Sequence, residues 1–171
     1  MQIDAQDFAR ALRVAEGRTA AHEFTRLCQG LPTPQTAEIS WQVAGGHDAP
    51  TGRMWLDIQA QGQVGLVCQR CLETMPVMLR VDNTVGLAPD QASLDALDTL
   101  ESSGEGPDIE YVLADQRLDL LSLVEDELIL VLPYAPRHDV CPGVSGQAGA
   151  AGAARQDKPS PFAVLEQLRK H

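Results

Sequence analysis

The sequence of 171 residues has few aromatic side chains, few cysteines and no long apolar run. Only seven residues are Phe, Trp or Tyr, but 44% of the chain is hydrophobic, a content typical of one globular domain. No apolar run approaches the roughly 20 residues of a membrane-spanning helix. The first residues also lack the positive start and the apolar stretch of a secretory signal. We therefore expect a cytoplasmic protein that makes no membrane contact.

Cysteine occurs only four times. Because cytoplasmic thiols are kept reduced, a framework of structural disulfides is not expected. The cysteines point instead to metal binding, to redox chemistry or to ordinary buried thiols.

Positive charge is nearly absent from one long segment. Between Asp82 and Glu127 the chain has thirteen acidic residues and a single basic one, Arg117, whereas the remainder has eleven acids and twelve bases. The net charge of −11, taken alone, argues against nucleic-acid binding, because binding to a polyanion needs local positive charge. The acidity belongs to one segment, however, and does not describe the rest of the chain.

Sequence motifs of common enzyme classes are missing as well. The chain contains no Gly-rich phosphate loop, no nucleophile elbow and no HExxH pair. We therefore expect a non-enzymatic protein without a small-molecule substrate.

Strand-like segments fill residues 38–87. Residues 38–44, 53–60, 63–68 and 76–87 are typical of antiparallel strands, and in the last of them apolar and polar residues alternate with a period of two. We expect turns at the glycines of this region, which are Gly45, Gly46, Gly52 and Gly62.

Residues 118–133, "LDLLSLVEDELILVLP", predict the main helix. Asp119 is placed to cap its start, and Pro133 ends it. The helix has an apolar stripe suited to covering a sheet, formed by Leu120, Leu121, Val124, Leu128, Val131 and Leu132. The fold class predicted is α+β, with an antiparallel β-meander covered by one main helix.

The chain divides into three predicted parts. Residues 1–141 form the α+β domain, in which residues 88–107 are an acidic loop with room for one short helix. Residues 142–160, rich in Gly, Ala, Ser and Gln, form a flexible linker. Residues 161–171 form a short, tethered C-terminal helix that docks on this chain or on a partner.

Two pairs of residues have the spacing of metal ligands. Cys68 and Cys71 are separated by two residues, as are His138 and Cys141, and together they offer the three sulfurs and one nitrogen of a tetrahedral zinc site. The alternative is that the thiols pack as small apolar groups. A thioredoxin-like redox site is disfavoured, because such a site needs its cysteines at a helix start, whereas a strand follows Pro76 here.

The acidic trio of Glu125, Asp126 and Glu127 lies within the predicted helix. Asp126 points away from the apolar stripe, while Glu125 and Glu127 flank its two edges and diverge, so they are poorly placed to share an ion. We expect a solvated face and structural pairing of Glu125 and Glu127 with Arg70 or Arg137.

Three blocks together resemble the bacterial YceD family of large ribosomal RNA subunit accumulation proteins. They are residues 66–73, "LVCQRCLE", residues 118–141, "LDLLSLVEDELILVLPYAPRHDVC", and residues 161–170, "PFAVLEQLRK". The resemblance covers about residues 40–170 and implies a non-enzymatic factor that supports processing or stability of the 23S rRNA precursor. One departure is that many relatives carry further cysteines after the proline-rich stretch, where this chain has only Cys141.

Two kinds of partner follow from this resemblance and from the charge. If the protein binds the 23S rRNA precursor directly, its contacts lie outside the acidic segment, at Arg70, Arg80, Arg137, Lys158, Arg169 and Lys170. Alternatively, the acidic segment binds basic large-subunit ribosomal proteins and the protein is an adaptor without RNA contact.

Overall fold

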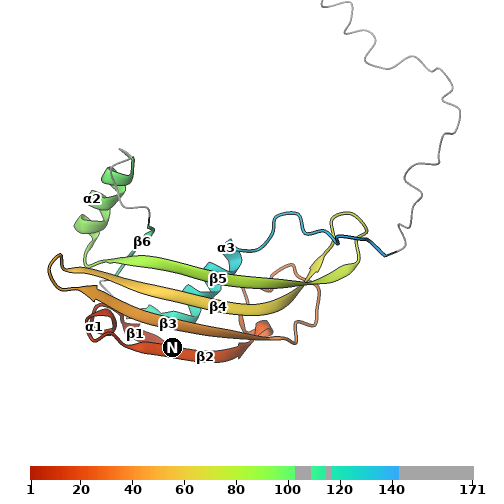
Figure 1. Cartoon of the computed structure of the whole chain (residues 1–171), viewed down its shortest axis with the longest axis horizontal. Coiled ribbons are helices and arrows are strands. Elements are labelled where there is room, and N and C mark those ends of the chain that lie inside the picture. The colour runs from red at the N-terminus through yellow and green to blue at the C-terminus, as the bar shows by residue number, and fades with distance from the viewer. Residues whose placement is uncertain (103–108, 115–116, 143–171) are drawn as a thin grey trace, which may run out of the picture. The chain divides into compact units, whose positions relative to one another are not determined.

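The computed structural model describes residues 1–102, 109–114 and 117–142 of the chain (Figure 1). All its helices and strands lie in a first unit, Met1–Arg137, and residues 138–142 are the described part of a second unit. The elements are, in order, β1 (Gln2–Asp4), α1 (Ala5–Arg10), β2 (Val14–Ala20), the 3-10 helix η1 (Ala21–Glu23), β3 (Glu38–Asp48), β4 (Arg53–Val67), β5 (Thr74–Ala88), α2 (Gln91–Ser102), β6 (Tyr111–Leu113), β7 (Arg117–Asp119) and α3 (Leu120–Leu130).

The main sheet has five strands in the order β2-β3-β4-β5-β6. Strands β2 to β5 form an antiparallel meander, and β6 joins β5 in parallel. Strands β1 and β7 form a separate two-stranded sheet. The predicted α+β class with an antiparallel meander is therefore confirmed.

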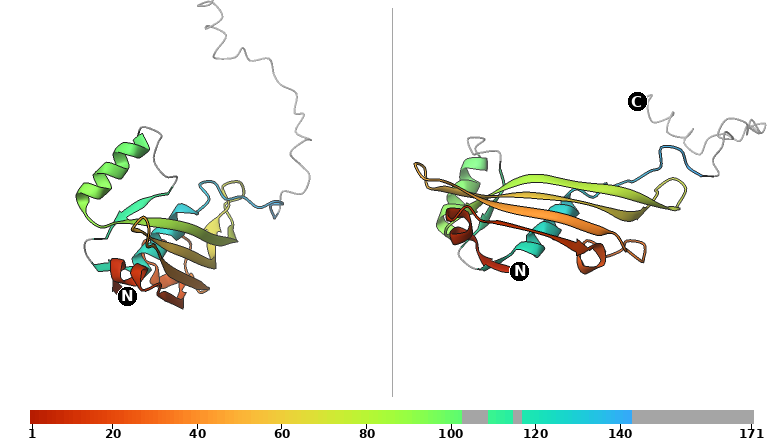
Figure 2. Two further views of the ribbon diagram at one scale, coloured as in Figure 1. Left: turned by 60° about the vertical axis from the view of Figure 1, so that its left-hand side comes forward. Right: turned by 60° about the horizontal axis from the view of Figure 1, so that its bottom comes forward.

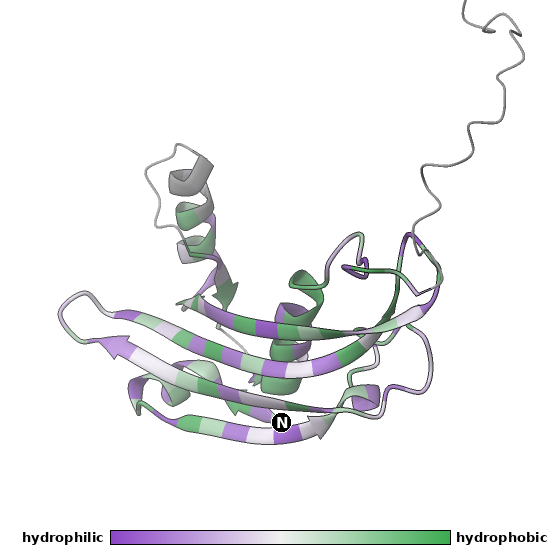
Figure 3. Cartoon of the chain, turned by 45° about the vertical axis from the view of Figure 1, so that its right-hand side comes forward, coloured by the Kyte–Doolittle hydropathy of each residue, from purple (hydrophilic) through white to green (hydrophobic). Residues whose placement is uncertain are grey.

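The core lies on one face of the main sheet, because alternate side chains of each long strand point to that side. On β4 the pattern is regular, with Leu56, Ile58 and Ala60 buried and Gln59 and Gln61 exposed. Figure 2 shows α1 and α3 packed along the buried face, and Figure 3 shows hydrophobic and hydrophilic residues alternating along the strands. On the opposite face of β2 to β5 most exposed side chains are polar, although Val14 and Met78 are exposed there as well.

Three of the four predicted glycine turns are wrong. Only Gly52, with a φ of 70°, lies in a turn, which joins β3 to β4. Gly62 lies inside β4, which is one continuous strand and not two, and a Cβ there would come within 2.6 Å of the Ile39 side chain. Gly46 leaves room in the same way for the Trp55 ring, and Gly45 for the backbone of α1. These glycines allow close packing inside strands, a role that a pattern of single residues does not distinguish from a turn.

The predicted acidic loop, residues 88–107, contains more regular structure than expected. The twelve-residue helix α2 occupies most of residues 88–107, and the short strand β6 lies after it in the sequence. Strand β2, which no sequence pattern predicted, forms one edge of the main sheet. The predicted linker and C-terminal helix, residues 142–160 and 161–171, lie outside the described residues apart from Pro142 and remain predictions.

The last turn of α1 ends in a left-handed residue that offers a first test. Leu12 has a φ of 50° and is 63% exposed, and its N–H donates to the Ala9 carbonyl at 3.0 Å. Glycine adopts this conformation without the strain that a Cβ causes. We therefore expect Leu12→Gly to raise the free energy of unfolding by about 1 kcal/mol in urea denaturation. Leu12→Ala, which keeps the Cβ, should give no gain; an equal gain with both variants would place the effect in the exposed apolar side chain.

Candidate metal centre

A tight turn of residues 68–73, here called the knuckle, joins β4 to β5. The Cys68 N–H donates to the Glu73 carbonyl at 2.9 Å, and the Leu72 N–H donates to the Cys68 carbonyl at 2.9 Å. Leu72 has the left-handed φ of 63° that lets the chain reverse within so few residues. The local sequence therefore folds so that both cysteines of the motif lie on one short loop.

The backbone of the knuckle also supports one of its thiols. The Arg70 N–H donates to the Cys68 sulfur at 3.4 Å, and such a donor favours the negatively charged thiolate that binds metals. The Gln69 N–H donates to the Pro136 carbonyl at 2.8 Å, which ties the knuckle to the segment after α3. Cys68 is fully buried, and Cys71 is half-buried.

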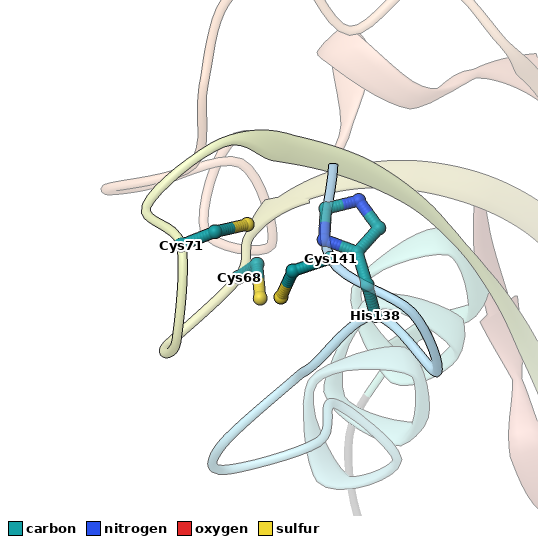
Figure 4. A group of neighbouring side chains, drawn as sticks. All are labelled: Cys68, Cys71, His138 and Cys141. Carbon is teal, nitrogen blue, oxygen red and sulfur yellow. The ribbon is translucent and has the colours of Figure 1, made fainter. Parts of the chain in front are cut away.

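The four residues predicted as metal ligands lie together. The ligand atoms of Cys68, Cys71, His138 and Cys141 are all within 4.8 Å of one another, with Cys68 and Cys141 buried. Figure 4 shows the three thiols and the imidazole gathered side by side. Sixty-six residues separate the two pairs in the sequence, so only the fold brings them into one group.

This donor set fits zinc. Structural zinc sites are tetrahedral, commonly with three cysteines and one histidine, at metal–ligand distances of about 2.3 Å for sulfur and 2.0 Å for nitrogen. Ligand atoms within 4.8 Å of one another need only small shifts to reach that arrangement. The cysteine motif lies between two strands and not at a helix start, so the context that would activate a redox thiol is not the one observed.

The carboxylates of α3 were predicted to lie on a solvated face, and for Glu125 this is wrong. Glu125 is only 7% exposed and accepts hydrogen bonds from the Arg26 N–H at 2.7 Å, the Leu27 N–H at 3.1 Å and the Arg26 Nε at 3.0 Å. Its partner is thus Arg26, which no sequence pattern indicated, and not Arg70 or Arg137. The exposed Asp126 also pairs with the Arg26 guanidinium.

Glu127 is buried too and accepts a hydrogen bond from the Asn83 side-chain amide at 3.0 Å. Burial raises the pKa of its carboxyl group, the Asn83 hydrogen bond opposes this shift, and the charges of Glu110 and Asp126 reinforce it. The core-facing side of α3 is accordingly broader than the predicted apolar stripe. It includes Leu120, Leu123, Val124, Glu125, Glu127 and Leu128.

The predicted helix limits are close to those observed. The Asp119 carboxylate accepts from the N–H groups of Leu121 and Ser122, as an N-cap does, and α3 ends at Leu130, shortly before Pro133. Val131, predicted in the stripe, is 39% exposed.

The candidate RNA-contacting residues lie on different parts of the protein. Arg70 is exposed on the knuckle, Arg80 is exposed on the polar face of β5, and Arg137 is exposed after α3. Lys158, Arg169 and Lys170 are outside the described residues. In the described ranges, no helix is long and apolar enough to cross a membrane.

The fold and the site define an α+β protein with a candidate metal centre of three thiols and one imidazole. The family model of the Large ribosomal RNA subunit accumulation protein YceD matches residues 56–169, and the chain belongs to this family. The chain is similar to the Large ribosomal RNA subunit accumulation protein YceD of Haemophilus influenzae, with 37% identity over 117 residues. That match covers 66% of this chain and 63% of the relative. No solved structure matches the chain.

Proposed function

We propose that this protein is a non-enzymatic ribosome-biogenesis factor that acts in the cytoplasm and supports synthesis, processing or stability of the 23S rRNA of the large subunit. The observation that carries the proposal is the family match over residues 56–169, which includes the knuckle, α3 and both ligand pairs. The buried carboxylates of α3 have structural roles, because Glu125 accepts from backbone N–H groups and Glu127 accepts from the Asn83 side-chain amide.

We further propose that Cys68, Cys71, His138 and Cys141 bind Zn²⁺ as a structural centre. Two of the ligands come from the knuckle, whose exposed residues include Arg70 and Leu72. Zinc supplies four ligand bonds that fix this loop, and it carries no catalytic step in the proposal.

The proposal is tested by deleting the gene and measuring rRNA. We expect the ratio of mature 23S to 16S rRNA to fall by roughly half or more, with precursor or fragments accumulating, and a plasmid copy of the gene to restore it. Northern blots or capillary electrophoresis of total RNA measure the ratio. An unchanged ratio in the deletion strain, under conditions in which the gene is expressed, would contradict the proposed function.

A second candidate is the adaptor that binds ribosomal proteins without touching RNA. The acidic residues Asp82, Asp90 and Asp95, all exposed, favour it. Ultraviolet crosslinking in cells distinguishes the two functions, because direct contact attaches 23S sequences to the protein. The adaptor instead yields crosslinks to ribosomal proteins only with a chemical crosslinker.

A further inference from the structure

A groove of about 700 Å³ lies on the polar face of the sheet, opposite the core. Four strands line it, and each contributes two polar side chains. We call these eight residues the polar sheet face; they are Glu16 and Arg18 of β2, Ser40 and Gln42 of β3, Gln59 and Gln61 of β4, and Arg80 and Asp82 of β5.

The strand register arranges the eight residues in two parallel rows. The first, here called the basic row, runs Arg18, Ser40, Gln61, Arg80 across the four strands, and the second, the acidic row, runs Glu16, Gln42, Gln59, Asp82. Neighbouring strands are about 4.8 Å apart, so the two arginines lie roughly 14 Å from each other. The rows are two residues apart along every strand, a separation of about 7 Å.

Both guanidinium groups of the basic row are available to a partner. Across residues 1–102, 109–114 and 117–142, neither the Arg18 nor the Arg80 side chain forms an ion pair or a hydrogen bond. The polar atoms between them are only partly used. The Ser40 hydroxyl donates to the backbone carbonyl of Gln61 at 3.2 Å, and within the described residues the Gln61 side-chain amide has no hydrogen-bond partner. In the acidic row, the Gln59 amide donates to Asp82 over a long 3.4 Å.

The two rows match the two parts of an extended RNA strand. Guanidinium groups bind phosphate oxygens, and hydroxyl and amide groups donate to phosphates and to the ribose 2′-OH. Carboxylates accept from the exocyclic amino group of cytosine, and glutamine amides both donate to and accept from base edges. A duplex fits poorly, because its two phosphate strands would approach the carboxylates of the acidic row.

We infer that the polar sheet face binds a single-stranded segment of RNA, with phosphates along the basic row and base edges along the acidic row. This inference rests on the proposed function and names the surface that would make the RNA contact. It places Arg80 in the contact and adds Arg18, which is not among the RNA-contacting residues predicted from the sequence. A basic peptide is disfavoured along the basic row, because the two unpaired guanidinium groups there would repel its lysines and arginines.

Fluorescence anisotropy with fluorescein-labelled 12-nucleotide oligo(C) and oligo(U) RNA tests the basic row. We expect the double variant Arg18→Gln, Arg80→Gln to bind both RNAs roughly tenfold more weakly. The slope of log affinity on log salt should fall by about 1.4, since each phosphate contact with a single strand contributes about 0.7. The matched control is Arg13→Gln with Arg117→Gln, which removes the same charge from exposed positions outside the groove and should change affinity little.

The acidic row makes a separate prediction. The whole protein should prefer oligo(C) over oligo(U), because uracil lacks the exocyclic amino group that a carboxylate accepts from. The double variant Glu16→Gln, Asp82→Asn should bind both RNAs more tightly, since repulsion from the phosphates is lost, but with a smaller preference for oligo(C). Thermal unfolding followed by circular dichroism verifies that each variant is folded.

Several outcomes would overturn the inference. These are no RNA binding by the unmodified protein, equal loss in the Arg13/Arg117 control, unchanged affinity in the folded Arg18/Arg80 variant, or binding of a lysine-rich peptide in place of RNA. The deletion strain separates this result from the proposed function. If deletion lowers 23S rRNA but the Arg18/Arg80 variant binds RNA normally, the surface is wrong and the function stands. If deletion changes nothing while that variant loses RNA binding, the surface stands and the function is wrong.

Discussion

Removing zinc from the protein is expected to lower its free energy of unfolding by at least about 3 kcal/mol, and Cys68→Ser should have the same effect. Cys68 is fully buried and lies beside the other three ligands, so the substitution removes a ligand from the interior of the site. The cost should be below the roughly 10–16 kcal/mol of zinc-finger peptides, because the sheet has a hydrophobic core of its own.

Elemental analysis and thermal unfolding measure this prediction together. Protein purified without chelator should contain zinc that EDTA removes, and the melting temperature should fall by roughly 10 °C on removal. Zinc should also leave as the pH falls, because protons compete for the thiolates and the imidazole. The matched control is Cys28→Ser, a half-buried thiol outside the ligand set whose hydrogen bond to the Ala21 carbonyl a hydroxyl can replace. Protein that carries no zinc from the start, or equal losses in both serine variants, would rule out a structural zinc centre.

Glu125→Ala is expected to destabilise the protein by about 2–4 kcal/mol, the second of the large effects. The Glu125 carboxylate is the acceptor for the N–H groups of Arg26 and Leu27, and Leu27 is 1% exposed. Alanine would leave the buried Leu27 N–H and the part-buried Arg26 N–H without this acceptor and would remove one side of the ion pair with the Arg26 side chain.

Two neighbouring variants separate the causes of that loss. Asp126→Ala removes the other carboxylate that pairs with Arg26, but this carboxylate is 52% exposed, so a much smaller loss is expected. Glu125→Gln keeps one oxygen as an acceptor and should fall between the two. Urea denaturation of the three variants measures their free energies of unfolding and so ranks the three losses. If Glu125→Ala and Asp126→Ala cost the same, the interaction with the guanidinium matters and the backbone hydrogen bonds do not.

The same contacts explain why an acidic trio inside a helix is not a catalytic cluster. Glu125 fixes the segment after η1, Glu127 binds Asn83 of β5, and Asp126 faces the solvent. Glu125 and Asp126 therefore share Arg26, whereas Glu127 contacts a different strand, although the three carboxylates are consecutive in sequence. The sequence predicted their divergence correctly from the 100° rotation per residue, but it could not predict which neighbours would bury them.

Local pattern by itself determined several parts of this protein. The period of two in residues 76–87 gave the two faces of β5, and Asp119 and Pro133 gave the limits of α3, because both kinds of information are contained in neighbouring residues. Ligand chemistry and equal spacing were enough to select Cys68, Cys71, His138 and Cys141 as one set. The family resemblance added a proposed function that no single motif indicated.

Only the tertiary structure decided the remainder, because it depends on residues far apart in the chain. The sequence indicates a turn at Gly62, but the structure shows that the Ile39 side chain of the adjacent strand occupies the space that a Cβ there would need. Glu125 looks solvated until Arg26, ninety-nine residues away, is placed beside it. The alignment of Arg18 with Arg80 follows from the registers of three strand pairs, none of which is fixed by a local pattern. Periodicity tells which way a side chain points, whereas pairing and packing determine what it meets there.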